Sequence, residues 1–124
     1  MFNDYTMDTT KPTTQLLGRF QPWHQGHTEL FRRAFAKTGQ VAILLREQDG
    51  TKKNPFDFEE RTYQISYALD FAGYQRGKDY EIYLVPNITH ITYGRDVGYS
   101  IKQEHLGEDL ESISASKIRE KILT

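Results

Sequence analysis

The chain has 124 residues, a length that suits one domain with a buried core. Charged residues make up 27% of it and the formal net charge is −1, which argues against a surface for nucleic acid. Because cysteine is absent, disulfides, thiolate catalysis and cysteine-based zinc sites are excluded. No apolar run approaches the ~20 residues of a membrane helix, and the first residues have no signal-peptide pattern. We therefore expect a cytoplasmic protein without a membrane partner.

The first twelve residues carry few apolar side chains, so we expect a flexible N-terminal tail over 1–12. Strand-like and helix-like segments then alternate, which predicts a single domain over 13–124. A short apolar run over 15–20 predicts a strand. The following residues place Leu30, Phe31, Ala34 and Phe35 at helical spacing, and Gly39 ends that helix.

Further elements follow in the same alternation. A continuous apolar run over 41–45 predicts a buried parallel strand. The next helix starts at a capping box formed by Asp57 and Glu60 and closes at Gly73. The last elements are a strand over 80–88, two polar strands near a sheet edge over 90–96 and 99–106, and a helix over 114–124 capped by Ser114.

This order predicts an α/β fold with a right-handed, parallel arrangement. In such sheets, ligands bind at the carboxyl ends of the strands, where the chain passes into a helix. Two segments fall at such junctions, GRFQPWHQGH at 18–27 and ISASKIR at 113–119. We expect the functional site there.

The first segment has the residue types of an anion site. Gly26 allows close approach of the backbone, and the helix start offers free N–H groups. His24 and His27 lie three residues apart, so both project from the first helical turn, where an imidazole can donate to a phosphate oxygen. The alternatives are a packed turn or a metal site. A metal site lacks a third ligand, because His90 and His105 are distant in sequence, and we expect none.

The second segment offers another helix start. Ser116 can present a hydroxyl and a backbone N–H to an anion, and Arg119 can add a two-pronged guanidinium. Taken alone, this segment is equally a capped helix. Like the first segment, it lies where a strand passes into a helix, and this equivalent position favours a phosphate site.

Together the two segments resemble the H-x-G-H and I-S-x-T-x-x-R signatures of the nucleotidyltransferase superfamily, with Ser116 where threonine is usual. The resemblance implies a Rossmann-like three-layer nucleotidyltransferase fold with a mainly parallel sheet of about five strands. Within the superfamily, GRFQP, NPFDFEER at 54–61 and LVPNI at 84–88 are similar to nicotinamide mononucleotide adenylyltransferases.

The resemblance implies an enzyme that moves AMP from ATP to a phosphate-bearing acceptor and releases pyrophosphate, with nicotinamide mononucleotide as acceptor and NAD as product. It implies Mg²⁺ bound through the substrate phosphates. The catalytic residues would be His24, His27 and Arg119. The nucleotide-binding residues would be Gly18, Arg19, Phe20, Gly26, Ser114, Ser116 and Arg119.

The residues expected near the acceptor lie in four parts of the chain: Arg19, Trp23, Arg46, Asn54, Arg61, Tyr93, Arg95 and Asp96. Trp23 either stacks on the acceptor ring or packs in the loop, and residues 93–99 either line the site or form a polar turn. Only NITH, at 87–90, lies between EIYLVP at 81–86 and ITYGRD at 91–96, whereas a parallel crossover takes a dozen or more residues. The strand-like segment over 90–96 therefore pairs differently with the sheet, or the crossover before it is lost.

Other functions stay open on the sequence. The length is similar to that of glycerol-3-phosphate cytidylyltransferases, which use CTP. A nucleotide-binding sensor without turnover is another alternative. The sequence does not decide the oligomeric state, and a homo-oligomer is among the possibilities.

Overall fold

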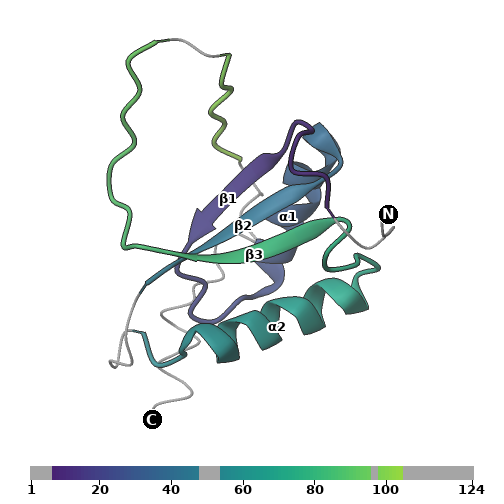
Figure 1. The fold of residues 1–124 in the computed structure, drawn as a ribbon. Coiled ribbons are helices and arrows are strands. Elements are labelled where there is room, and N and C mark those ends of the chain that lie inside the picture. The colour runs from purple at the N-terminus through teal and green to yellow at the C-terminus, as the bar shows by residue number, and fades with distance from the viewer. Residues whose placement is uncertain (1–6, 48–53, 96–97, 105–124) are drawn as a thin grey trace.

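The computed structural model describes residues 7–47, 54–95 and 98–104, and Figure 1 traces them. Two βαβ units follow each other within this part of the chain. Their elements are β1 (Thr14–Gly18), α1 (Gln25–Thr38), β2 (Val41–Arg46), α2 (Phe58–Phe71) and β3 (Tyr80–Val85).

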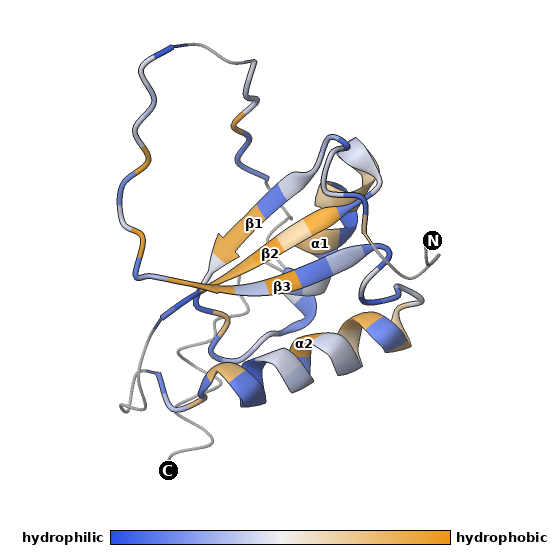
Figure 2. Ribbon diagram, in the orientation of Figure 1, coloured by the Kyte–Doolittle hydropathy of each residue, from blue (hydrophilic) through white to orange (hydrophobic). Residues whose placement is uncertain are grey.

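The three strands form one parallel sheet in the order β1-β2-β3. Leu16 of β1 lies opposite Ile43 of β2, which in turn lies opposite Ile82 of β3. The predicted first, second and third strands and their parallel arrangement are thus confirmed. Figure 2 shows β2, the central strand, as hydrophobic along most of its length, as expected for a strand with a neighbour on both sides.

Both helices cover the same face of this sheet. Along β2 every second side chain, starting from Val41, is fully buried. These side chains share one hydrophobic cluster with Phe31 and Ala34 of α1 and with Ile65 and Leu69 of α2. Because alternate residues of a strand point to one face, both helices pack on that face.

The opposite face of the sheet also carries apolar side chains. Leu17, Leu44 and Tyr83 lie side by side across the three strands. Leu17 and Leu44 are half-buried and Tyr83 is 38% exposed. Within the described ranges, the fold is therefore one layer of helices on one sheet, an α/β Rossmann-like unit, and the expected third layer is not part of it.

The helix ends follow the local sequence signals. Gly39 ends α1 in the left-handed region at φ 77°, and its N–H donates to the carbonyl of Phe35. The Asp57 carboxylate accepts from the N–H of Glu60 at 2.8 Å and caps α2. Ala72 ends α2 and Gly73 follows at φ 96°, so the predicted limits of both helices are confirmed.

The predicted edge strands after β3 are wrong for the residues that the structure describes. Residues 90–95 and 99–104 pair with no strand, and Figure 1 shows this green segment arching away from β3. Almost all of its side chains are exposed, so no apolar burial offsets the cost of ordering a strand. The four residues after Pro86 are too short for a crossover to a parallel neighbour. The expected sheet of about five strands is thus reduced to three here.

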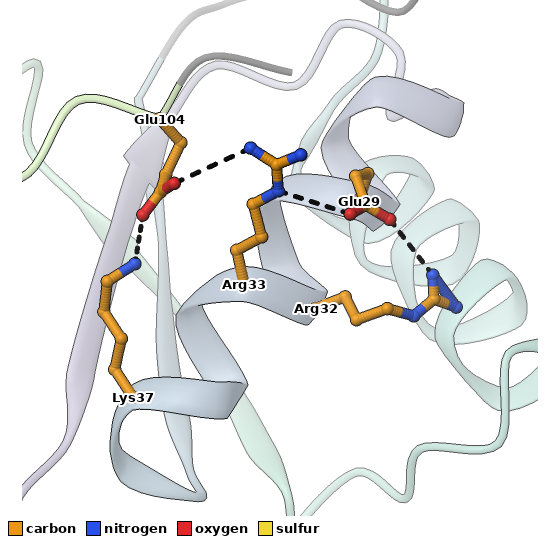
Figure 3. A network of polar contacts seen from close by, with 5 residues as sticks. All are labelled: Glu29, Arg32, Arg33, Lys37 and Glu104. Atoms are coloured by element: carbon orange, nitrogen blue, oxygen red, sulfur yellow. Dashed lines mark hydrogen bonds and ion pairs between the residues drawn. The ribbon is translucent and has the colours of Figure 1, made fainter. Parts of the chain in front are cut away.

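The far end of the arch returns to α1 (Figure 3). The Glu104 carboxylate forms ion pairs with Lys37 and, at 3.7 Å, with Arg33. Arg33 also pairs with Glu29 at 3.3 Å, and Glu29 pairs with Arg32. This network attaches residue 104 to the solvent-facing side of α1.

Part of the expected tail contacts the sheet. Met7 is buried, and the Gln40 side chain donates to the carbonyl of Asp8 at 2.7 Å. Hydrogen bonds from the hydroxyl and the N–H of Thr10 lower the pKa of Asp8 and hold a turn over 8–11. Residues 1–6 lie outside the described part, as do the predicted last helix and four of the predicted site residues: Asp96, Ser114, Ser116 and Arg119. In the described residues no helix has the length and apolar character needed to span a bilayer.

Candidate functional site

A cavity of about 250 Å³ lies at the loop between β1 and α1. This is the carboxyl end of the strand, where α/β sheets bind ligands. Three of the predicted nucleotide-binding residues line it together with His27. The complete lining is Leu17, Gly18, Arg19, Phe20, Gln21, His27 and Leu30.

The two histidines form a reciprocal pair at the start of α1. His24 is the N-cap residue, and its Nδ1 accepts from the N–H of Gly26 at 3.0 Å. Nδ1 of His27 accepts from the backbone N–H of His24 at 3.1 Å. The rings stack, with centroids 3.7 Å apart and planes 19° from parallel. The packed-turn alternative is therefore partly correct, because the pair caps the helix.

These hydrogen bonds determine which ring nitrogen carries the proton. A nitrogen that accepts from an N–H group is unprotonated, so in both neutral rings the proton lies on Nε2. Burial lowers the pKa of His24; it lowers the pKa of His27 to about 3, with a smaller contribution from the neighbouring His24. Near pH 7 both imidazoles are neutral, and each keeps one Nε2–H donor free of its capping role.

Phe20 forms one wall of the cavity in an unusual backbone conformation. Its φ is 50°, in the left-handed region that residues other than glycine rarely adopt. Its ring lies edge-on to His27 at 4.8 Å and against Trp23 at 5.0 Å. A Cβ at Gly18 would come within 2.8 Å of this ring, so glycine makes room for Phe20. Such strain is typical of functional sites.

Trp23 packs in the loop rather than presenting a free face. It is 7% exposed, and its Nε1–H donates to the hydroxyl of Thr28 at 2.8 Å. Its ring contacts the rings of Phe20 and His27. Of the two alternatives for Trp23, the structure therefore supports packing over stacking on an acceptor.

Arg19 is the cationic side chain among the described residues that line the cavity. Its guanidinium lies 3.4 Å from Oδ1 of the buried Asn54. Arg46, at the carboxyl end of β2, donates to the carbonyl of Ile88 at 3.2 Å, and its buried Nε has no partner among the described residues. Arg19 and Asn54 are thus brought together, whereas Arg46 faces the segment that leaves β3.

Arg61 does not have the position expected of an acceptor ligand. It is 1% exposed, and its guanidinium donates to the backbone carbonyls of Arg19 at 3.0 Å, Arg46 at 2.9 Å and Asp57 at 3.3 Å. A cation with these bonds holds three chain segments and is covered from solvent. In this structure Arg61 thus contacts backbone carbonyls, and its contact with an acceptor stays a prediction.

Tyr93 and Arg95 lie on the arch after β3. Both are exposed, and neither belongs to the described lining of the cavity. The structure thus does not bring them to the histidines. Conversely, the sequence analysis did not single out three lining residues: Leu17, Gln21 and Leu30. Gln21 belongs to the GRFQP motif, but nothing there marked it as a site residue, because a polar residue before proline in a loop is ordinarily exposed.

The arrangement suits an anion. The described lining of the cavity contains Arg19 and the neutral His27 at the amino end of α1, and no carboxylate. The described residues also contain no cluster of three or more His, Cys, Asp or Glu side chains fit for a metal ion. The described residues therefore provide fixed dipoles and one cation that can hold negative charge.

Sequence comparison places this fold and site in a family. The model of the Cytidylyltransferase-like family matches residues 16–97, and the chain belongs to this family of nucleotidyltransferases. The matched range contains the histidine pair, Phe20, β2, β3 and the last three residues of β1.

Particular relatives are nicotinamide-nucleotide adenylyltransferases. The chain is 32% identical over 72 residues to that of Archaeoglobus fulgidus, covering 56% of this chain and 41% of the relative. It is 38% identical over 73 residues to that of Picrophilus torridus, covering 57% of this chain and 40% of the relative. The chain therefore spans about two fifths of the length of these curated relatives.

A solved structure is similar as well. It is that of a bifunctional NMN adenylyltransferase/ADP ribose pyrophosphatase from Francisella tularensis, with a TM-score of 0.53 and 29% sequence identity. The similarity covers 61% of this chain and 22% of that one.

Proposed function

We propose that this protein transfers AMP from ATP to a phosphate-bearing acceptor and releases pyrophosphate, with nicotinamide mononucleotide as the acceptor. Membership of the nucleotidyltransferase family supports the reaction class. The two adenylyltransferase relatives and the resemblance of GRFQP, NPFDFEER and LVPNI support the acceptor.

In the proposed step, an oxygen of the acceptor phosphate attacks the α-phosphorus of ATP. A new P–O bond forms, the bond between the α-phosphorus and the α,β-bridging oxygen breaks, and the electron pair leaves with pyrophosphate. His27 would donate its Nε2–H to an oxygen that gains negative charge, and His24 would donate beside it. No covalent intermediate is needed, because positioning and electrostatic stabilisation are sufficient for phosphoryl-type transfer.

The observation that carries this proposal is the fixed tautomer of the histidine pair. Each ring receives a backbone N–H on Nδ1 and is thereby obliged to carry its proton on Nε2. A neutral donor that is oriented before substrate arrives costs no reorganisation during the reaction. The same two contacts form the capping box of α1, so the pair both caps the helix and orients its two Nε2–H donors.

Magnesium enters the proposal with the substrate. The described lining of the cavity offers no carboxylate, so these residues do not fit a Mg²⁺ site held by the protein itself. The ion would be bound by the phosphates of the nucleotide. Arg19 would face the triphosphate or the acceptor phosphate, with Asn54 fixing its guanidinium.

The test is a pyrophosphate-release screen on the full chain. ATP and CTP are each combined with nicotinamide mononucleotide, nicotinate mononucleotide, phosphopantetheine and glycerol-3-phosphate, and products are identified by mass spectrometry. We expect the fastest release with ATP and nicotinamide mononucleotide. Faster turnover with CTP and glycerol-3-phosphate would overturn the proposed substrates but leave the proposed reaction class, nucleotidyl transfer, in place. Binding of ATP without release from any pair would favour the nucleotide sensor.

A further inference from the structure

We propose that Arg61 is a positioning residue: together with Gln21 it clamps the loop between β1 and α1, and through Phe20 it sets the orientation of the His27 ring. The catalytic value of that orientation rests on the proposed function. The clamp itself is a property of the fold and can be tested without a substrate.

Arg61 joins the three chain segments that meet beside the cavity. One guanidinium nitrogen donates both to the carbonyl of Arg19, after β1, and to that of Arg46, at the end of β2. Its Nε donates to the carbonyl of Asp57, the N-cap residue of α2. A planar fork of fixed donors is suited to holding several acceptors in one geometry, and a lysine is not.

Gln21 makes a second connection between the same two loops. Its Nε2–H donates to the carbonyl of Phe56 at 2.8 Å, and its Oε1 accepts from the N–H of Phe56 at 2.9 Å. The side chain thus pairs with a backbone unit through both of its polar atoms, and it is 1% exposed. The Arg19–Asn54 hydrogen bond crosses the same junction.

The residues that these hydrogen bonds hold flank Phe20 in the sequence. The carbonyl that Arg61 holds belongs to Arg19, directly before Phe20, and the side chain that pairs with Phe56 belongs to Gln21, directly after it. Phe20 has a φ of 50°, which persists only where the surroundings determine the backbone. Its ring lies edge-on to His27 at 4.8 Å. A change in the loop path would therefore move the ring that supports His27.

Burial separates this role from ligand binding. Arg61 and Gln21 are each 1% exposed, and all the described partners of the Arg61 guanidinium are backbone carbonyls. Arg61 is not among the residues that line the described cavity, whereas Gln21 is, so the Arg61 variant separates positioning from lining and the Gln21 variant is judged by the His27 ring signals. Its influence on a bound anion would pass through Phe20 and His27.

The experiment compares the wild-type chain with Arg61→Lys and Gln21→Ala, and uses Arg32→Lys as the matched control. Arg32 is an exposed arginine of α1 that pairs with Glu29. The first readout is NMR of the His27 ring without ligand, recording its tautomer from the ring nitrogens and the shift of its carbon-bound protons, which the Phe20 ring current displaces. The second is the rate of pyrophosphate release per folded molecule.

We expect Arg61→Lys to stay folded, shift the His27 ring protons and mix its tautomers. We also expect kcat to fall about tenfold or more while KM for the nucleotide changes less, because small displacements of catalytic groups are costly. Gln21→Ala should change the His27 signals in the same direction, and Arg32→Lys should leave both readouts unchanged. If Arg61→Lys does not fold, Gln21→Ala alone decides the inference.

Wild-type His27 signals in the folded variants would overturn the inference and leave Arg61 with a stabilising role only. A reduced melting temperature with normal turnover per folded molecule would do the same. If the wild type transfers no nucleotide but the variants still shift the His27 ring, the proposed function fails and the positioning role stands.

Discussion

At the scale of residues, the site depends on two imidazoles that stay uncharged. Burial and the neighbouring His24 lower the pKa of His27 to about 3, so the ring of the free protein is neutral near pH 7. The ring then acts through its Nε2–H dipole, and Arg19 supplies the positive charge of the described cavity.

Replacing His27 tests this donor. We expect His27→Ala to lower kcat by about 10²-fold or more, since a preorganised donor is worth a few kcal/mol in the transition state. His27→Gln retains a neutral donor and should lose less. Steady-state kinetics with circular dichroism of each variant provides the measurement. Equal turnover of folded His27→Ala and wild type would remove the catalytic role and leave helix capping.

The same low pKa predicts how stability depends on pH. Because the folded pKa of about 3 lies below the ordinary value of 6.5, the unfolded chain binds more protons between these values, and the free energy of unfolding falls as pH drops from 6.5 towards 3. His27 alone contributes a slope of at most ~1.4 kcal/mol per pH unit. Urea unfolding at several pH values should show a shallower dependence for His27→Gln. An unchanged dependence would contradict the burial of a neutral ring.

Gly18 provides a third test at this scale. In Gly18→Ala the new Cβ would lie 2.8 Å from the buried Phe20 ring, which Trp23 and His27 hold from other sides. We expect a loss of about 1–3 kcal/mol in the free energy of unfolding, as for other overpacked sites. Gly94→Ala is the matched control, because a Cβ there meets nothing within 4 Å. Similar losses for both variants would show that the Phe20 contact is unimportant.

At the scale of elements, the two helix starts have different tasks. His24 caps α1 with a ring that also belongs to the candidate site. Asp57 caps α2 with its carboxylate, and its backbone carbonyl accepts a hydrogen bond from Arg61. The amino ends of both helices thus lie next to the loop that carries Phe20. The stability of α2 is therefore linked to the geometry of the site.

The capping bond of the Asp57 side chain can be tested separately from the bond between the Asp57 carbonyl and Arg61. Asp57→Ala removes the acceptor for the Glu60 N–H and should cost about 1 kcal/mol of stability. Asp57→Asn keeps an acceptor at this position and should cost much less. Denaturant unfolding monitored by circular dichroism measures both. If the two variants are equally destabilised, the capping bond is not the source of the effect.

At the scale of the whole molecule, the arch over residues 86–104 differs from the predicted edge strands. It leaves β3 and is attached again at Glu104, which pairs with Lys37 and Arg33 of α1. Between these points its side chains are almost all exposed, so few contacts hold it. The ion pairs at its end therefore restrict a segment that the sheet does not hold.

Removing the charge of Glu104 should release the arch. We expect Glu104→Gln to be cut by trypsin after the exposed Arg95 and Lys102 several-fold faster than wild type, with little change in global unfolding. Glu81→Gln, which breaks the ion pair with Arg76 elsewhere, is the control. Mass spectrometry of the early fragments identifies the cut sites. Equal cleavage of both variants would show that Glu104 does not restrain the arch.

The sequence by itself determined the two βαβ units and pointed to the start of α1 as one of two candidate site positions; the other, 113–119, lies outside the described residues. The continuous apolar run of β2, the glycines after both helices and the Asp57 cap are local signals, because each depends on residues a few positions apart. The spacing of His24 and His27 around Gly26 likewise marked the start of α1 as the site. These features need no knowledge of distant contacts.

The tertiary structure alone decided the roles of Arg61, Gln21 and Trp23, and the path after β3. Nothing in the composition near Arg61 shows that its guanidinium is enclosed by carbonyls from residues 15 and 42 positions away. Residues 90–95 have strand-like composition, but a strand also needs a neighbour with free backbone groups and a covered apolar face. Burial and pairing depend on segments far apart in the chain, and local patterns carry no record of them.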